Sequence, residues 1–480
     1  MAVEYEFGGP FGAAAIIFGL PVLLIAFAFG CNDVSGCPVP SLLNPQSLTW
    51  AGVKADTGLL NADVTTLFSW DAMLISVGYY VFNLFLWRVL PAQEIYGTKL
   101  KHHGRPLQYR FNSFFSSLVI LAICGAGSYL QGAEFVVWTY ISDNYVQLLT
   151  ANILIAYALS IFVYANSFTV DTKYPNRDMR ELATGGVTGN MIYDFYIGRE
   201  LNPRVTLPFL GEVDIKTWCE FCPGLTLWAL LDLAFIARQY RNYGYISDSI
   251  LFTTAVQAYY VFSSQYGESV ILTMMDTTTD GMGFMLSFGD LVWVPFLYST
   301  QCRYLSTYPL HLGWTRIIAF VAIFVLGLYI FRAANNQKHM FRTDPANPAV
   351  ANLSSIQTKR GTRLLTSGWW GISRHINYFG DWLQALPFSL PTGLAGYMIL
   401  PAGTILAGDS EGLRMVDGRV VVQDSAAGWG MVFTYFYVLY FGTLLIHREG
   451  RDDAMCAKKY GEDWKTYKRI VRWKIIPWVY

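Results

Sequence analysis

Long apolar runs alternate with more polar loops along the whole chain. Clear examples are residues 13–29, 75–90, 117–129, 152–162, 317–330 and 430–446. A helix needs about 20 mostly apolar residues to cross the hydrocarbon core of a bilayer, so each run is a candidate span. The pattern predicts an all-α, polytopic integral membrane protein with about ten transmembrane helices.

The ten predicted spans include some that are short or interrupted by glycine and proline, which membrane helices tolerate. Their centres lie near Phe18, Tyr80, Ala122, Ala156, Leu227, Ala255, Leu291, Ile323, Pro391 and Val438. Basic residues gather in alternate loops, which lie around residues 99–110, 173–216 and 332–363, and in the tail 448–474. By the positive-inside rule these segments are cytosolic, so ten spans place both termini in the cytosol.

Composition supports a membrane protein and excludes some partners. Only 14% of the residues are charged and 53% are hydrophobic, against about 25% charged in a typical soluble domain. The net charge of zero argues against nucleic-acid binding, which draws on a basic surface. Cys31 and Cys37 are expected to form a disulfide if their loop is lumenal. Cys219 and Cys222 fit packing better than a metal site, because no second ligand pair lies near them in sequence.

The chain divides into two predicted parts. Residues 1–310 carry spans one to seven, and residues 311–480 carry spans eight to ten with a cytosol-facing cofactor pocket. Between them, residues 343–360 are rich in Pro, Ala, Asn and Ser, and we expect a flexible linker there. No Gly-x-Gly-x-x-Gly follows a strand, so a soluble dinucleotide-binding domain is not predicted.

Two polar clusters in the second part suggest where a cofactor binds. Residues 364–382 read LLTSGWWGISRHINYFGDW, which is too polar for an ordinary span, and a second cluster covers residues 447–461. Polar groups at membrane depth are costly unless they line a protein cavity. We therefore interpret the two clusters as one cofactor pocket at the membrane surface.

The side chains in and near these clusters suit an anionic cofactor with a ring. Lys338 and Arg342 are four residues apart, so they share a helix face and together can hold a phosphate. The alternative is a cytosolic flank whose cations reach into the interface. Trp370, His375 and Asn377 add stacking and hydrogen-bonding groups. Further candidates for the cofactor site are Arg448, Asp452 and Tyr460. The spacing supports an anionic cofactor and names none.

Tyr260, near the end of the sixth predicted span, is a candidate proton donor. A tyrosine at the bottom of an apolar pocket can donate or orient a proton. The alternative is an aromatic anchor at the membrane interface, because tyrosine is common there.

These stretches together resemble the sterol reductase family over nearly the whole chain. The matching segments are residues 90–112, 193–203 (YDFYIGRELNP), 280–295 (DGMGF…FGDLVWVP), 364–382 and 447–461 (HRE…RDD…KYG). The amino-terminal YEFGGP, residues 5–10, looks like that of the fungal Δ14-sterol reductases within this family.

The resemblance implies NADPH-dependent reduction of the sterol C14=C15 double bond, by protonation at C15 and hydride transfer to C14. It implies a Δ8,14-diene substrate, a place in ergosterol biosynthesis and a multi-pass location in the endoplasmic reticulum membrane. Membrane lipids and other sterol-biosynthesis enzymes are the implied partners. Carried over by motif, the implied cofactor residues are Lys338, Arg342, Trp370, His375, Asn377, Arg448, Asp452, Lys459 and Tyr460. Tyr260 and Asp452 are the implied proton-transfer residues.

One departure from the family pattern leaves alternatives open. Many relatives carry an acid where this chain has Ser263, which bears on the proton route, the substrate preference and the activity itself. The alternatives are a Δ7- or C24(28)-sterol reductase and a non-catalytic sterol-binding paralogue. Isoprenylcysteine carboxyl methyltransferases have a similar carboxy-terminal arrangement, but they are much shorter.

Overall fold

The computed structural model describes residues 5–59, 64–100, 104–171, 179–406 and 412–480. The basic loop residues Lys101, Lys173 and Arg177 lie outside the described residues. The described chain is mostly helical, as the apolar runs predict, and it forms two compact units. Unit 1 contains residues 1–309 and 394–430, and unit 2 contains residues 310–393 and 431–480.

Six helical segments in the described residues are long and apolar enough to cross a membrane. They are α1 (Gly9–Gly30), α4 (Trp70–Val89), α5 with the turn after it (Ser113–Glu134), α7 with the turn after it (Tyr145–Thr169), α9 to α10 (Ile215–Tyr243) and α15 (Gly313–Thr343). They contain the predicted centres Phe18, Tyr80, Ala122, Ala156, Leu227 and Ile323. These helices fit a multi-pass membrane protein.

The other four predicted centres lie in segments that are not both long enough and apolar enough to count as candidate spans, so ten spans remain a prediction. Ala255 lies in α11 (Asp248–Tyr266) and Leu291 in the π-helical segment η8 (Gly289–Leu297). Pro391 lies in the turn η9 (Leu390–Thr392) after α17 (Ile376–Ser389), and Val438 lies in α19 (Phe436–Tyr460). The 14 residues of α17 span about 21 Å, less than the hydrocarbon core, and the second half of α19 is charged.

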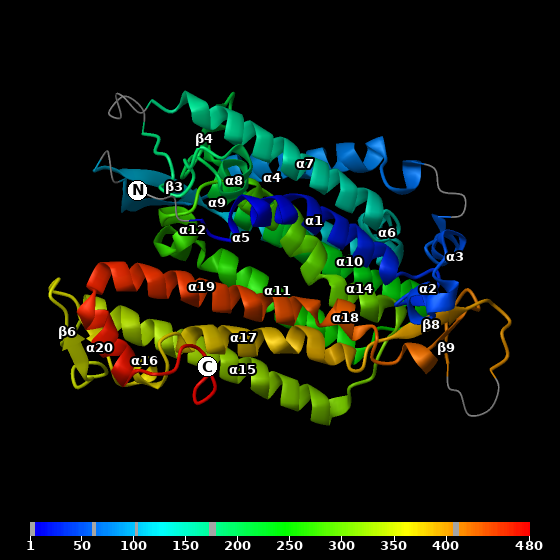
Figure 1. Ribbon diagram of the computed structural model, residues 1–480. Helices are drawn as coiled ribbons and strands as arrows, with labels where there is room; N and C mark the ends of the chain where they lie inside the picture. The colour runs from blue at the N-terminus through cyan, green and yellow to red at the C-terminus, as the bar shows by residue number, and fades with distance from the viewer. Residues whose placement is uncertain (1–4, 60–63, 101–103, 172–178, 407–411) are drawn as a thin grey trace. The chain divides into compact units, whose positions relative to one another are not determined.

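Unit 1 is built around α10 (Leu225–Tyr243), which contacts α6 (Val136–Asp143), α11, α14 (Thr300–Thr307) and η8. Trp228, Leu231 and Phe235 of α10 are completely buried. In Figure 1, α1, α7 and α10 run along one another in this unit. Burying so many apolar side chains of one helix makes α10 the core of unit 1.

One end of unit 1 is closed by a small antiparallel sheet. Its strand order is β1 (Gly36–Cys37), β8 (Tyr397–Leu400), β10 (Val420–Val422) and β9 (Leu413–Arg414). The predicted disulfide between Cys31 and Cys37 is present beside β1 and is confirmed. Because β8 pairs with β1, residues 394–430 belong to unit 1, whereas the sequence pattern groups them with residues 311–480.

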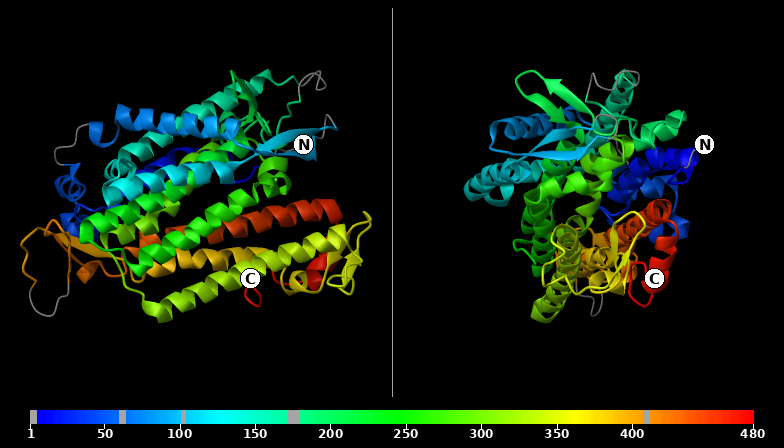
Figure 2. Two further views of the ribbon diagram at one scale, coloured as in Figure 1. Left: turned by 180° about the vertical axis from the view of Figure 1, so that it is seen from behind. Right: turned by 90° about the vertical axis from the view of Figure 1, so that its left-hand side faces the viewer.

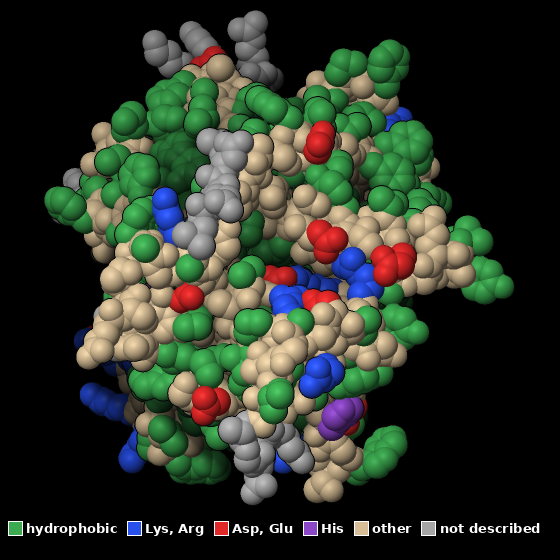
Figure 3. Space-filling model, turned by 90° about the vertical axis from the view of Figure 1, so that its right-hand side faces the viewer, with side chains coloured by type: hydrophobic (Ala, Val, Ile, Leu, Met, Phe, Trp, Pro, Cys, Tyr) green, Lys and Arg blue, Asp and Glu red, His purple; other side chains and the backbone are tan. Residues whose placement is uncertain are grey.

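Arginines tie this end of unit 1 together. Arg303 donates to the Cys31 carbonyl at 2.6 Å and to the Ala28 carbonyl at 2.9 Å, and Arg238 forms an ion pair with Asp33. Figure 3 shows one face of the molecule, on which positive and negative side chains gather beside one another among hydrophobic ones. Pairing of this kind keeps charged groups satisfied close to apolar surface.

The all-α expectation needs correction at the other end of unit 1. Two hairpins are present there, β2 (Gln93–Lys99) with β3 (Pro106–Phe111) and β4 (Arg204–Leu207) with β5 (Gly211–Asp214). Leu107, Tyr109 and Phe111 of β3 are buried at every second position. This period of two is the strand pattern, which the stronger apolar runs on either side concealed in the sequence.

Unit 2 is a helical assembly in which α17 packs against both α15 and α19. Figure 2 shows the three helices side by side. Glycine allows the closest approach: a Cβ at Gly327 of α15 would lie 2.5 Å from the Gln384 backbone nitrogen, and one at Gly380 of α17 would lie 2.6 Å from that of Phe331. Small residues let helix backbones meet in this way.

Residues 343–360 are packed, in contrast to the expected flexible linker. Val350 is 1% exposed and forms a cluster with Phe341, Leu365 and Trp370. Beyond it, β6 (Ser355–Gln357) pairs with β7 (Arg363–Leu365). The segment is short of apolar residues of its own, and it is ordered by the hydrophobic surface of α15 and Trp370, which composition alone does not reveal.

Candidate functional site

The carboxy-terminal end of α15 carries a cation over an aromatic ring. The Lys338 Nζ lies 4.1 Å from the centre of the Trp370 ring, within the range of a cation–π contact. Arg342 follows one turn later and lies close enough to repel the Lys338 ammonium. The Trp370 Nε1 donates to the Ala334 carbonyl at 2.8 Å, which fixes the ring against α15. The predicted residues Lys338, Arg342 and Trp370 are therefore together.

His375, Tyr378 and Asp452 form a second group, between the start of α17 and the middle of α19. The Tyr378 hydroxyl donates to Asp452 Oδ2 at 2.7 Å, and the His375 and Tyr378 rings stack with centres 4.8 Å apart. The His375 Nδ1 is 3.9 Å from the same carboxylate oxygen, too far for a hydrogen bond. Tyr378 is thus the direct partner of Asp452, which sequence reasoning did not single out.

The electrostatics of this group keep the histidine neutral. Burial lowers the pKa of the His375 imidazole to about 4, because removal from water disfavours the charged ring, and the Asp452 carboxylate offsets only part of that. At neutral pH His375 therefore offers one hydrogen-bond donor and one acceptor without a charge.

Asn377 and Arg448 border the same region of unit 2. The Asn377 Oδ1 is buried and has no hydrogen-bond partner within the residues that the structure describes. A buried acceptor of this kind calls for an explanation, and a bound ligand is one. Arg448, one turn before Asp452 on α19, acts electrostatically on both Tyr378 and Asp381.

Lys459 and Tyr460 lie about two turns beyond Asp452 on α19. Tyr460 packs against the hydrophobic cluster of Trp464, Tyr467 and Val471, and Lys459 Nζ lies 5.2 Å from its ring. These two predicted residues therefore sit at the end of α19, with a packing role in the structure described.

The tail of the chain makes contacts that sequence reasoning missed. The backbone nitrogens of Arg374 and His375 donate to the carbonyls of Trp473 at 2.9 Å and Lys474 at 2.8 Å. Glu449, 1% exposed, lies 3.5 Å from Arg374 Nη2 and 3.4 Å from Lys474 Nζ. Arg374 and Glu449 lie in the two polar clusters, but their pairing depends on where the tail folds, for which the sequence gives no signal.

Tyr260 belongs to unit 1, whereas the other predicted site residues belong to unit 2. Its ring centre lies 5.8 Å from that of the buried Trp228, and its carbonyl accepts from the Ser263 hydroxyl at 3.1 Å. Ser263, at the position where relatives were expected to carry an acid, therefore bonds to the backbone of its own helix.

The unit 2 residues combine a fixed aromatic plane, cationic groups, an unpartnered amide oxygen and a carboxylate held by tyrosine. Such a set can bind an anionic, amide-bearing cofactor and hold a proton near it. Among the described residues, no group of three or more histidine, cysteine, aspartate or glutamate side chains is arranged to hold a metal ion.

Comparison with known proteins gives matches over the full length of the chain. The sequence model of the ergosterol biosynthesis ERG4/ERG24 family matches residues 1–480. The chain is 57% identical to the Delta(14)-sterol reductase ERG24B of Gibberella zeae, over 99% of this chain and 98% of the relative. It is 59% identical to the Delta(14)-sterol reductase of Neurospora crassa, over 99% of this chain and 96% of the relative. The match to the Delta(14)-sterol reductase erg24 of Schizosaccharomyces pombe is 40% identical, over 99% and 97%.

Proposed function

We propose that this chain, which belongs to the ergosterol biosynthesis ERG4/ERG24 family, reduces the C14=C15 double bond of a sterol Δ8,14-diene. The observation that carries the proposal is the 57% and 59% identity to relatives named Delta(14)-sterol reductase, over 99% of the chain. A fold alone does not give a function. Here the match extends over both units, and so over every segment that carries the candidate site.

We infer that NADPH is the reductant, because the unit 2 residues fit its chemical groups. Lys338 and Arg342 are suited to phosphate, and Trp370 offers an aromatic plane held in place by its own hydrogen bond. The unpartnered Asn377 Oδ1 suits the amide N–H of a nicotinamide. When bound, NADPH supplies hydride. Arg448, Asp452 and His375 would border the same cofactor.

The proposed reaction adds a proton to C15 and a hydride to C14 of an unactivated alkene. Protonating carbon requires a well-placed acid in a site that excludes water. We assign this to Tyr260 and Asp452. The Tyr260 ring lies beside the buried Trp228 ring, and aromatic faces of this kind can also stabilise positive charge on the substrate. Asp452 is oriented by the Tyr378 hydroxyl, which donates to it.

We propose the endoplasmic reticulum membrane as the location, with both termini in the cytosol. The Cys31–Cys37 disulfide supports this, because disulfides persist in oxidising compartments such as the lumen. These cysteines follow the carboxy-terminal end of α1, so its amino-terminal end at Gly9 lies on the opposite, cytosolic side. The basic loops and tail are assigned to the same side.

Turnover by the purified protein in lipid nanodiscs tests the proposal. NADPH is supplied with a Δ8,14-diene and, separately, with a 7-dehydro sterol, and the products are identified by mass spectrometry. We expect saturation of C14=C15 alone. Reduction of only the Δ7 bond would assign the sister activity, and NADPH binding without turnover on either sterol would favour a non-catalytic sterol-binding protein.

The proton-transfer assignment has its own test in the same assay. Tyr260→Phe and Asp452→Asn are each expected to lower turnover by about 100-fold or more, since a positioned acid contributes on that order. Tyr266→Phe serves as the control, because it removes the hydroxyl of an exposed tyrosine on the same helix and keeps the ring that contacts Phe114. Unchanged turnover in Tyr260→Phe would remove this tyrosine from the mechanism.

A further inference from the structure

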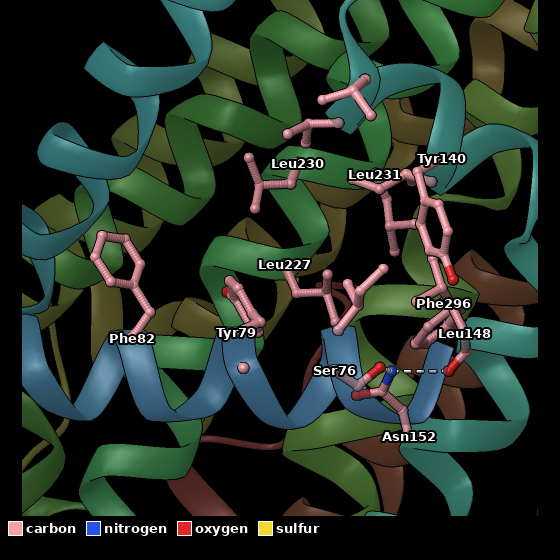
Figure 4. A pocket seen from close by; sticks show the side chains of 15 residues that line it. Ser76, Tyr79, Phe82, Tyr140, Leu148, Asn152, Leu227, Leu230, Leu231 and Phe296 are labelled. Atoms are coloured by element: carbon pink, nitrogen blue, oxygen red, sulfur yellow. Dashed lines mark hydrogen bonds between the residues drawn. The ribbon is translucent and has the colours of Figure 1, made fainter. Parts of the chain in front are cut away.

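Unit 1 contains a cavity of about 450 Å³ among its membrane-crossing helices. It is lined by α4, α6, α7 and α10, together with Phe296 of η8 (Figure 4). This volume lies within the range of small-molecule sites, about 300–1,000 Å³. The walls are mostly aliphatic and aromatic, and none of the lining residues in the described chain is charged.

The cavity has a polar end. Asn152, 2% exposed, donates to the Leu148 carbonyl at 2.8 Å and to the Ser76 hydroxyl at 3.3 Å. The hydroxyl oxygen of Tyr140 is buried, and the Ser69 side chain lies near enough to act on it as a hydrogen-bonding group. In Figure 4, Ser76, Asn152 and Tyr140 lie toward one side of the view and Phe82 toward the other. Ser76 and Phe82 are six residues apart on α4, a rise of about 9 Å.

Gly78 lines the cavity and has no side chain. It lies on α4 between Ser76 and Phe82, is exposed, and a Cβ added there would meet nothing within 4 Å. Any larger side chain at this position would extend the wall. A side chain at Gly78 would therefore have room to enter part of this space.

We propose that this cavity is a second sterol-binding site, separate from the reaction site. The occupant must be a mainly apolar body, because the walls are apolar, and must reach the cavity from the bilayer, because the helices around it are candidate spans. It must carry a hydroxyl but no charge, because the polar end offers the hydroxyls of Tyr140 and Ser76 without an ion, while the amide of Asn152 is bonded to Leu148, Ser76 and Tyr80. A sterol meets these requirements. A phospholipid headgroup finds no opposite charge, and an acyl chain has no group that can bond to the Tyr140 or Ser76 hydroxyl.

Tyr260 contacts α10 next to the cavity but does not line it. Leu227, Leu230 and Leu231 line the cavity, whereas the neighbouring Trp228 contacts Tyr260. Successive residues on a helix are about 100° apart, so Trp228 lies about 160° from Leu230 but only about 60° from Leu231. The cavity therefore adjoins the side of α10 that meets Tyr260, although neither Trp228 nor Tyr260 lines it. That the cavity is a second site, rather than the place of reaction, rests on the proposed role of Tyr260.

Photolabelling tests the proposal without relying on turnover. The full chain in phospholipid nanodiscs, without NADPH, is irradiated with a diazirine-bearing sterol, and labelled peptides are mapped by mass spectrometry. We expect saturable labelling of the segments 75–82 and 136–152, competed by unlabelled sterol. Because no catalysis is read, the result is independent of whether the chain proves to be a reductase.

Substitutions distinguish a specific sterol-binding site from a crevice that only contacts bilayer lipid. Gly78→Leu adds a side chain to the wall of the cavity, which leaves less room for a rigid ring system, and is expected to lower sterol labelling by about tenfold or more. Gly125→Leu in α5 is the matched control, because Gly125 is also exposed, also has nothing within 4 Å of its Cβ, and does not line the cavity. Tyr140→Phe removes the hydroxyl at the polar end and should weaken sterol binding by about three- to tenfold.

Two results would overturn the proposal. One is labelling of these segments by a photoreactive phospholipid acyl chain to the same extent, without competition by sterol. The other is equal sterol labelling in the wild-type chain, Gly78→Leu and Tyr140→Phe.

Discussion

A substitution at Lys338 can remove its charge and keep most of its packing, so it tests whether this residue binds phosphate. Its ammonium lies over Trp370 and one turn from Arg342, which makes it the central cation of the proposed NADPH site. We expect Lys338→Met, which keeps most of the aliphatic length, to raise the KM for NADPH by about tenfold and to leave the KM for sterol unchanged.

Lys54 provides the matched control for Lys338. Its Nζ lies 5.3 Å from the Trp50 ring, so the same type of lysine–tryptophan pair occurs at a position outside the proposed site. Steady-state kinetics of Lys54→Met should match the wild type. An equal rise in the KM for NADPH in both variants would mean that the effect is not one of phosphate binding.

His375 gives the stability of the protein a specific pH dependence. Burial lowers the pKa of this imidazole to about 4 in the folded chain, whereas the unfolded value is about 6.5. Between these values the unfolded chain binds more protons, so stability is complete above about pH 6.5 and falls as the pH drops toward 4. The slope from this one group is at most about 1.4 kcal/mol per pH unit.

Thermal unfolding measured from pH 7 to pH 4 checks this prediction. His375→Gln should unfold with a shallower pH dependence than the wild type across this interval. His339→Gln, a change at an exposed histidine, is the control and should keep the wild-type slope. A wild-type slope in His375→Gln would show that the ring is not held neutral by burial.

At the scale of elements, the carboxy-terminal tail holds together the segments that carry His375 and Asp452. Glu449 of α19 faces Arg374, just before α17, and Lys474 of the tail. Leaving one member of a buried ion pair without its partner is strongly destabilising, by about 3–5 kcal/mol. We expect Glu449→Gln to lower the unfolding temperature and to raise the KM for NADPH, with a smaller effect on kcat at saturating NADPH.

An exposed ion pair in the same unit is the control for Glu449. Glu462 and Lys465 on α20 (Glu462–Ile470) lie 2.6 Å apart with both side chains largely exposed. Such surface pairs contribute about 0–1 kcal/mol, so Glu462→Gln should resemble the wild type in both measurements. If Glu449→Gln lowers stability and leaves the KM for NADPH unchanged, the tail supports the fold but does not position the cofactor residues.

The same elements show what the sequence could predict and what it could not. Apolar runs located α1, α4, α7 and α15, because length and hydropathy are local properties. The spacing of Lys338 and Arg342 placed them on one face for the same reason. The pairing of β1 with β8 joins residues about 360 positions apart, and the contact of Arg374 with Glu449 depends on the path of the tail. No local pattern records such long-range contacts.

For the whole molecule, strand pairing bears on the number of spans. Gly36 of β1 pairs with Met398 of β8, so the strands β8, β9 and β10 of this sheet lie on the same side as the Cys31–Cys37 disulfide. If that side is the lumen and the basic residues near 360 are cytosolic, the chain must cross the membrane between them and cross back before Arg448. This favours α17 with η9 and the first half of α19 as the ninth and tenth spans. Residues 376–392, about 25 Å long when helical, would then be a short span whose polar groups face protein.

Single cysteines in sealed microsomes test this topology. In a background with Cys456→Ser, Ala402→Cys lies in an exposed turn after β8 and Arg360→Cys lies between β6 and β7. A membrane-impermeant maleimide should label the cysteine at 360 in intact vesicles, and the one at 402 only after detergent opens them. Labelling of both from outside would mean that the chain does not cross between residues 360 and 402. The proposed ninth span would then not exist. Because β1 pairs with β8, the disulfide would also have to lie on the cytosolic side.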